Sequence, residues 1–279
     1  MSDTEFDIIR RYFTRQDPDR GDVVTGIGDD AALLQVPAGM ELVVCMDTLV
    51  DGVHFPTGTP AAAIGHKALA VNLSDLAAAG FIALRFDFSG NGQSEGDFAA
   101  STYSKQMAEI QKAVDIIAEK GAEWIGLAGH SMGAVIAILT AARMNRVKAV
   151  CALAGRLSGL KATHFFNKRQ LKELHDTGRV SFSSRGRPLQ LSTAFFADAE
   201  QFNLPETLKT LQAPLMIVHG DHDEIVSVEE AHLAQKLNPI NTKLAIIPDA
   251  DHMFSNDEHR LKISKLVVKW FEEQHHGYT

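Results

Sequence analysis

Short apolar runs and amphipathic stretches alternate along much of the chain from residue 81 onward. Each run is the length of a single strand and ends at glycine, proline or a polar turn, which is typical of strands buried in a parallel sheet. The runs are Phe81–Phe88, Trp124–Ala128, Val147–Ala154, Leu215–His219 and Lys243–Pro248. The sequence therefore predicts a sheet built from these five strands.

Helical patterns fill the gaps between the predicted strands. Met107, Ile110, Val114 and Ile117 recur at the spacing of one helix face, and Gly121 follows them as a stop signal. A second, strongly apolar helix is predicted after Gly133. Strands that alternate with helices indicate βαβ crossovers, so we expect an α/β fold with a mostly parallel sheet and flanking helices.

The alternation stops between residues 156 and 212, where charged residues are mixed with six of the 15 phenylalanines. So many large apolar side chains in an irregular segment indicate that it covers something apolar. Two interpretations are open: a helical excursion that packs on its own core, or a small cap over a substrate pocket. A pocket is expected at the carboxyl ends of parallel strands, where such sheets bind ligands.

Gly129-His130-Ser131-Met132-Gly133 is a G-x-S-x-G motif between a predicted strand and a predicted helix. In that context the motif forms a tight turn that projects the serine Oγ from the sheet. The glycines remove side chains that would clash, and the backbone N–H of Met132 is left to meet an oxyanion. Ser131 is thus the candidate nucleophile, and Met132 is a candidate oxyanion-hole donor.

A serine of this kind needs a base and an orienting acid, which follow it in the order acid, then histidine. Asp221 and Asp223 both come directly after the strand that ends at His219. We favour Asp223, which lies beyond the turn where a carboxylate can face inward, and Asp221 remains the alternative. His252 follows the last strand and is the candidate base, whereas His130, His219 and His222 are interpreted as structural.

Composition narrows the function classes. The 279 residues are 45% hydrophobic and 22% charged, which excludes a disordered chain. The net charge of −8, with no basic run, argues against a nucleic-acid partner. Two cysteines are too few for a disulfide framework or a thiolate metal cage. No apolar run has the length of a membrane span and the N-terminus lacks a signal-peptide core, so we expect a cytoplasmic protein with no membrane partner.

The segments RFDFSGNGQSEGDF, GHSMG, VHGDHDEIVS and DADHMF together resemble the α/β-hydrolase superfamily from about residue 81 onward. The resemblance is to small bacterial carboxylesterases and cinnamoyl-type esterases in particular. It implies that Ser131 forms an acyl-enzyme, that His252 shuttles the proton and that Asp223 supports the imidazole. It also implies a small-molecule ester substrate, with no cofactor and no metal.

The first 80 residues resemble a different family. GIGDDAALL, LVVCMDTLVDGVHF and GHKALAVNLSDLAAAG are similar to the N-terminal part of bacterial thiamine-monophosphate kinase. In that family the acids that match Asp29, Asp30, Asp47 and Asp51 lie at the magnesium and phosphate site, and Mg²⁺ prefers such oxygen ligands. The resemblance ends near Gly80, so we expect these acids on solvated turns, with residual Mg²⁺-phosphate or nucleotide binding as an alternative.

The kinase-like segment offers what a hydrolase sheet needs before its strand at Phe81. A strand at Leu42–Met46, a turn and an Ala-rich helix at Ala61–Ala79 follow in the required order. We therefore interpret residues 1–80 as a segment that completes the sheet and residues 81–279 as the catalytic region, with the cap at 156–212. No His-Gly turn follows the first strand, so the second oxyanion donor is expected at Thr48 or Leu49. A catalytically inactive fusion that serves as a binding or scaffold protein is the alternative, and the oligomeric state stays open.

Overall fold

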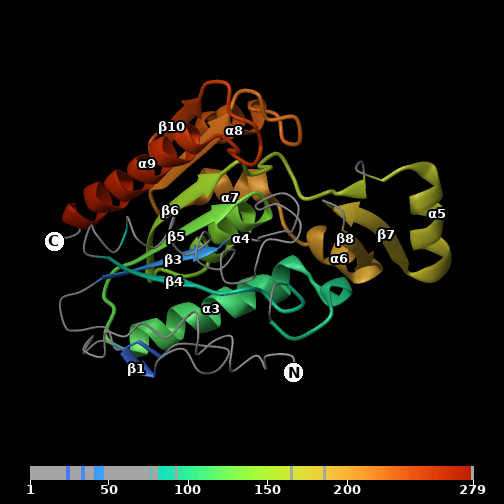
Figure 1. The fold of residues 1–279 in the computed structure, drawn as a ribbon, viewed down its shortest axis with the longest axis horizontal. Coiled ribbons are helices and arrows are strands. Elements are labelled where there is room, and N and C mark those ends of the chain that lie inside the picture. Colours follow the sequence, from blue (N-terminus) through green and yellow to red (C-terminus); the bar gives the residue numbers. More distant parts are fainter. Residues whose placement is uncertain are drawn as a thin grey trace, which may run out of the picture.

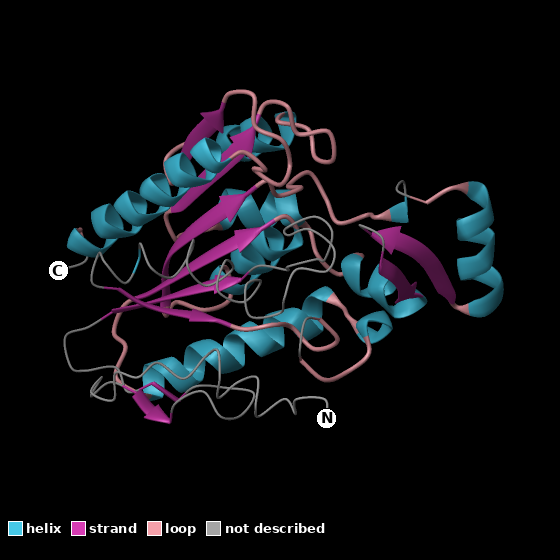
Figure 2. Ribbon diagram, in the orientation of Figure 1, coloured by secondary structure: helices cyan, strands magenta, loops and turns pink. Residues whose placement is uncertain are grey.

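A computed structural model describes residues 23–25, 33–34, 41–46, 76, 81–91, 94–163, 166–184 and 187–277 of the chain. Within these residues a six-stranded sheet runs through the middle, with helices on both of its faces (Figures 1 and 2). The strand order is β10-β9-β6-β5-β3-β4, and each neighbouring pair is parallel. The expected parallel α/β sheet is therefore confirmed.

The strands lie close to the predicted runs. They are β3 (Glu41–Met46), β4 (Phe81–Arg85), β5 (Ile125–His130), β6 (Val147–Leu153), β9 (Leu215–Gly220) and β10 (Thr242–Ile247). The main difference is β4, which was expected to continue to Phe88 but ends at Arg85. Beyond Arg85 the chain enters a turn at Ser89 and Gly90, where Gly90 has a φ of 77° that favours glycine.

Helices cover one face of the sheet with a large apolar cluster. They are α3 (Tyr103–Glu119), α4 (Met132–Ala141), α7 (Leu204–Thr210) and α8 (Glu229–Leu237). The predicted face of α3 is the buried one, and the helix begins at Thr102, whose side chain accepts a hydrogen bond from Lys105 N–H. α4 is buried along nearly its whole length, as expected for an apolar helix at the centre of a sheet.

The opposite face is covered by α9 (Asp257–His276), which lies across the sheet in Figure 1. Trp270 and Phe271 are buried there, and the Phe271 ring meets Trp124 edge to face at 5.8 Å between centroids. Leu76 and Phe81 belong to the same cluster. Burial on both faces explains why the strands read as continuous apolar runs rather than alternating ones.

The strand from the kinase-like segment lies inside the sheet. β3 pairs with β5 on one side and with β4 on the other, so Val43 lies opposite both Gly126 and Ala83. One strand from before Gly80 is therefore part of the main sheet. Of the Ala-rich helix expected at 61–79, only Leu76 lies within the described residues, and it is buried. The short strands β1 (Val23–Thr25) and β2 (Leu33–Leu34) pair with each other, separately from the main sheet.

Part of the segment 156–212 lies to one side of the sheet (Figure 1). This part contains α5 (Lys168–Thr177), the antiparallel hairpin β7 (Arg179–Ser184) and β8 (Arg187–Ser192), and α6 (Thr193–Ala199), whereas α7 packs in the main apolar cluster. The hairpin is not among the elements predicted from the sequence. Val180 and Leu191 pair across it, are buried and belong to alternating patterns on either side of the dipeptide Arg185-Gly186. The Phe195 ring packs on Tyr103 at 5.2 Å between centroids, which ties this part of the segment to α3.

The helices of the described part of the chain include none that is long and apolar enough to cross a membrane.

The position of β3 gives a test of the two-segment architecture. Expression of residues 81–279 alone removes an interior strand and leaves the edges of β4 and β5 unpaired, so the fragment should be insoluble. Val43→Pro in the full chain should also destabilise the fold, because proline cannot donate to the ladder of an interior strand. Soluble yield and thermal unfolding followed by circular dichroism measure both effects. A soluble fragment that unfolds at the temperature of the full chain would contradict this architecture.

Candidate active site

Ser131 lies in a strained turn between β5 and α4. Its φ of 55° and ψ of −115° are unusual for a residue with a side chain. The turn is so tight that a Cβ on Gly129 would lie 2.2 Å from the carbonyl oxygen of Gly133. The Ser131 N–H donates to the Leu153 carbonyl at 2.8 Å, which holds the turn against β6. This is the strand-turn-helix geometry that the G-x-S-x-G motif predicted.

Ser131, His252 and Asp223 form a continuous hydrogen-bonded chain. His252 Nε2 lies 3.1 Å from Ser131 Oγ, and His252 Nδ1 lies 2.7 Å from Asp223 Oδ2. Ser131 follows β5, Asp223 follows β9 and His252 follows β10, so the carboxyl ends of three parallel strands bring them together. The Asp223 side chain has no exposed surface and that of His252 is 7% exposed. Such an arrangement can remove a proton from the serine hydroxyl in a site with little water.

The Asp223 carboxylate is held by donors on both oxygens. Its Oδ1 accepts the N–H groups of Ile225 at 2.9 Å and Val226 at 2.7 Å, while its Oδ2 faces His219 as well as His252. Burial alone raises the pKa of this carboxyl group, but hydrogen bonds from His219, His252 and Val226 outweigh burial and hold the pKa well below its usual range. Asp223 is therefore ionised at neutral pH.

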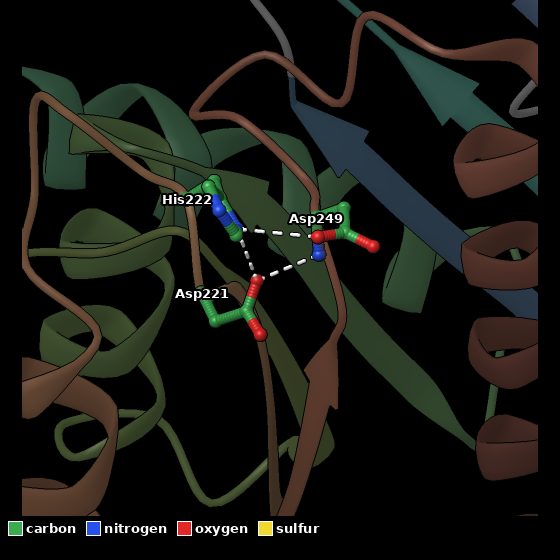
Figure 3. A group of neighbouring side chains, drawn as sticks. All are labelled: Asp221, His222 and Asp249. Carbon is green, nitrogen blue, oxygen red and sulfur yellow. Dashed lines mark hydrogen bonds and ion pairs between the residues drawn. The ribbon is translucent and has the colours of Figure 1, made fainter.

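Asp221, the alternative acid, makes different contacts. Its Oδ1 lies 2.8 Å from His222 Nδ1 and accepts the Asp249 N–H at 2.7 Å (Figure 3). These hydrogen bonds lower the pKa of Asp221 and the bond to Asp221 raises that of His222. The three exposed residues thus join the loop after β9 to the loop after β10. Asp223, rather than Asp221, is the aspartate that contacts His252.

Two histidines contact the candidate triad, although the sequence analysis interpreted both as structural. His130 Nε2 lies 2.7 Å from the His252 carbonyl oxygen, so the ring can donate to the backbone of the candidate base. His219 Nε2 lies 3.2 Å from Asp223 Oδ2. The sequence signal that could have identified these contacts is position, because His130 directly precedes Ser131 and His219 lies four residues before Asp223.

The candidate oxyanion donors are only partly described. Met132 is the first residue of α4, and N–H groups in the first turn of a helix have no partner within that helix. Thr48 and Leu49 lie outside the described residues, as do Asp29, Asp30, Asp47 and Asp51. The strand that leads to Thr48 is described, and its last residue, Met46, pairs with Gly129 beside the elbow.

The sheet, the elbow and the order of the three residues define an α/β-hydrolase fold, and solved structures agree. Est1E from Butyrivibrio proteoclasticus, seen with bound ferulic acid, is 24% identical, with a TM-score of 0.64 over 84% of this chain and 89% of its own. Alpha/beta hydrolase domain-containing protein 10 from mouse is 18% identical, with a TM-score of 0.65 over 85% of this chain and 92% of its own. These alignments are longer than residues 81–279 alone would allow, so they include part of the kinase-like segment.

Two protein families match parts of the sequence. Residues 110–254, just over half of the chain, match the family "BAAT / Acyl-CoA thioester hydrolase C terminal", and the chain belongs to this family. Residues 28–118 match the N-terminal domain of AIR synthase related proteins.

Curated relatives match the N-terminal part of the chain. The thiamine-monophosphate kinase of Salmonella typhimurium is 54% identical over 80 residues, and that of Escherichia coli is 52% identical over 80 residues. Each match covers 29% of this chain and 25% of the kinase. The chain thus spans about a quarter of the length of these kinases, and the resemblance noted in the sequence is confirmed.

The loops that carry Asp223 and His252 approach each other closely at Gly220. A Cβ on Gly220 would lie 2.1 Å from the carbonyl oxygen of Ala250, the same oxygen that accepts the His222 N–H at 3.1 Å. Because both partners are backbone atoms, neither can swing aside as a side chain would. A residue without a side chain at position 220 is therefore needed for the two loops to meet.

Gly220→Ala tests this close approach. The added methyl group must push the two loops apart, so the free energy of unfolding should fall by about 1–3 kcal/mol or more. Gly159→Ala is the matched control, because a Cβ at Gly159 meets no atom within 4 Å, and its effect should stay within about 0.5 kcal/mol. Urea unfolding measures both variants. Equal stability of the two would contradict the packing described here.

Proposed function

We propose that the chain is a serine carboxylesterase that hydrolyses small acyl or aryl esters through an acyl-enzyme intermediate. The observation that carries the proposal is the His252 ring, which reaches Ser131 with one nitrogen and the buried Asp223 with the other. The same contacts support Ser131 as nucleophile, His252 as general base and Asp223 as the orienting acid. We also propose the division into residues 1–80 and 81–279, with 156–212 as a cap.

In the proposed reaction Ser131 Oγ attacks the carbonyl carbon of the ester while its proton passes to His252 Nε2. The tetrahedral intermediate collapses as His252 returns that proton to the leaving alcohol, which leaves an acyl group on Ser131. Water then attacks the acyl-enzyme with His252 again as base, and the acid is released. Asp223 holds Nδ1–H of His252 and stabilises the imidazolium in both halves.

The developing oxyanion needs convergent N–H donors. We propose the Met132 N–H as one of them, since Met132 begins α4 and its N–H lies at the positive, N-terminal end of the helix dipole. We propose the second donor at Thr48 or Leu49, in the turn that follows β3. If so, the kinase-like segment supplies part of the catalytic machinery as well as a strand.

The substrate class rests on two observations. Partly buried Phe166, Phe182 and Phe196 form a ring cluster in the proposed cap, with centroids 5.8 Å apart for Phe166 and each of the others. Aromatic surface of this kind suits an apolar acyl or aryl group. The family description names acyl-CoA thioester hydrolysis, so a thioester is the second candidate substrate, and it would react at Ser131 by the same steps.

Ser131→Ala should abolish turnover while leaving the fold intact. Removal of the nucleophile should lower kcat by about 10⁴- to 10⁶-fold, and it should abolish labelling by a fluorophosphonate probe. Ser183→Ala, on the exposed part of the hairpin, is the control and should behave like the wild type. A panel of p-nitrophenyl esters, aryl esters and acyl-CoA thioesters separates the two substrate classes. A wild-type chain that takes no label and cleaves none of them would refute the proposal.

Asp223→Asn and Asp221→Asn should differ strongly. Loss of the Asp223 charge permits the wrong imidazole tautomer and should reduce kcat by about 10⁴-fold. Asp221→Asn alters an exposed contact between loops and should cost less than about tenfold. The lowered pKa of Asp223 keeps its carboxylate ionised well into the acid range, so wild-type activity should fall on acidification because the base, and not Asp223, takes up a proton. A loss confined to Asp221→Asn would reverse the assignment of the acid.

A further inference from the structure

We propose that His219 is a positioning residue of this site, which fixes the Asp223 carboxylate and tunes the base through it; this inference rests on the proposed function. His219 lies in β9 and has no exposed surface. The chain turns back after Gly220, so that the side chain of Asp223 returns to the ring of His219. The contact is therefore between a buried imidazole and a buried carboxylate.

The contacts of His219 define where its proton lies. Nε2 is 2.9 Å from the Val226 carbonyl oxygen and 3.2 Å from Asp223 Oδ2. Both atoms are acceptors at neutral pH, so Nε2 must carry the hydrogen and share it between them. Nδ1 is buried and has no hydrogen-bond partner among the described residues.

Burial of the His219 ring disfavours its charged form. A second proton, on Nδ1, would place a charge where the residue has no exposed surface, which is unfavourable unless that charge is fully hydrogen-bonded. His252 differs, because its two ring nitrogens contact the hydroxyl of Ser131 and the carboxylate of Asp223. His219 thus acts as a constant N–H donor, whereas His252 is placed to gain and lose a proton.

Asp223 Oδ2 is consequently shared by two imidazoles. His252 Nδ1 lies at 2.7 Å and His219 Nε2 at 3.2 Å, while backbone N–H groups of Ile225 and Val226 hold Oδ1. With donors on both oxygens, the carboxylate cannot rotate without losing a hydrogen bond. The bond from His219 also takes up part of the negative charge that would otherwise stabilise a protonated His252 ring.

Loss of the His219 donor should therefore shift the base. The titratable groups that contact His252 are Asp223, from the loop after β9, and His130, at the end of β5; Asp251 precedes it in its own loop. With these unchanged, the charge on Oδ2 would act on His252 alone and favour its protonated form. The acid limb of the activity profile should move to higher pH, and kcat should fall because the carboxylate is less well fixed.

Three variants of His219 test this inference. His219→Leu removes the donor, and His219→Asn places an amide at the depth of Nδ1, too short to reach Asp223. Both should raise the midpoint of the acid limb of kcat/KM by roughly 0.5–1 pH unit and lower kcat by up to about 10²-fold, with KM unchanged. His219→Gln, whose amide reaches the depth of Nε2, should restore the wild-type profile.

NMR titration of the His252 ring in the substrate-free protein gives a readout that does not depend on turnover. The titration midpoint should rise in His219→Leu and His219→Asn and return in His219→Gln. If it moves while the wild type cleaves no ester, the positioning inference holds and the proposed function fails. If the variants lose thermal stability but keep both the titration midpoint and the acid limb of the wild type, His219 only packs and the inference is overturned.

Discussion

The active-site geometry depends on the parallel alignment of β5, β9 and β10 within one sheet. β5 ends at the elbow, β9 at the turn before Asp223, and β10 at the loop that carries His252. Because these strands are parallel, their carboxyl ends lie at the same edge of the sheet. The imidazole ring of His252 is then long enough to reach from Ser131 Oγ to the Asp223 carboxylate. Hydrogen bonds between backbone groups, such as Ser131 N–H to the Leu153 carbonyl and Asp221 N–H to the Ile247 carbonyl, keep the loops in step with the sheet.

Histidine and aspartate side chains outside the candidate triad hold the same loops. His130 reaches the backbone of His252, His219 reaches Asp223, and the pair of Asp221 and His222 bridges to Asp249. The buried contacts have the greater effect on geometry, since exposed ion pairs contribute little once solvent screens them. The backbone contact at Gly220 adds a steric constraint, which leaves the two loops one way to approach each other.

The kinase-like segment shows that an interior strand of a parallel sheet has to meet only a few sequence requirements. β3 is joined to both neighbours through backbone hydrogen bonds, which are the same for any residue except proline. An apolar run such as Leu42–Met46, followed by a turn, meets the remaining requirement, because both faces of the sheet are covered. A strand whose sequence is similar to part of a kinase can therefore take an interior place in an α/β-hydrolase sheet.

The sequence by itself determined the alternation of strands and helices, the elbow at Ser131 and the order of the candidate acid and base. These features depend on local sequence patterns, namely apolar runs, helical spacing and glycine at a turn that only glycine fits. The hairpin of β7 and β8 also has a local pattern, with apolar and polar residues alternating on either side of the dipeptide Arg185-Gly186, but the charged residues within 156–212 obscured it. Only the tertiary structure decided that Asp223 rather than Asp221 meets His252, because the two lie on one short loop and differ in which way the turn points them. It alone brought His219 and His130 onto the site, since contacts between side chains on different strands depend on register and loop direction, which no local pattern encodes.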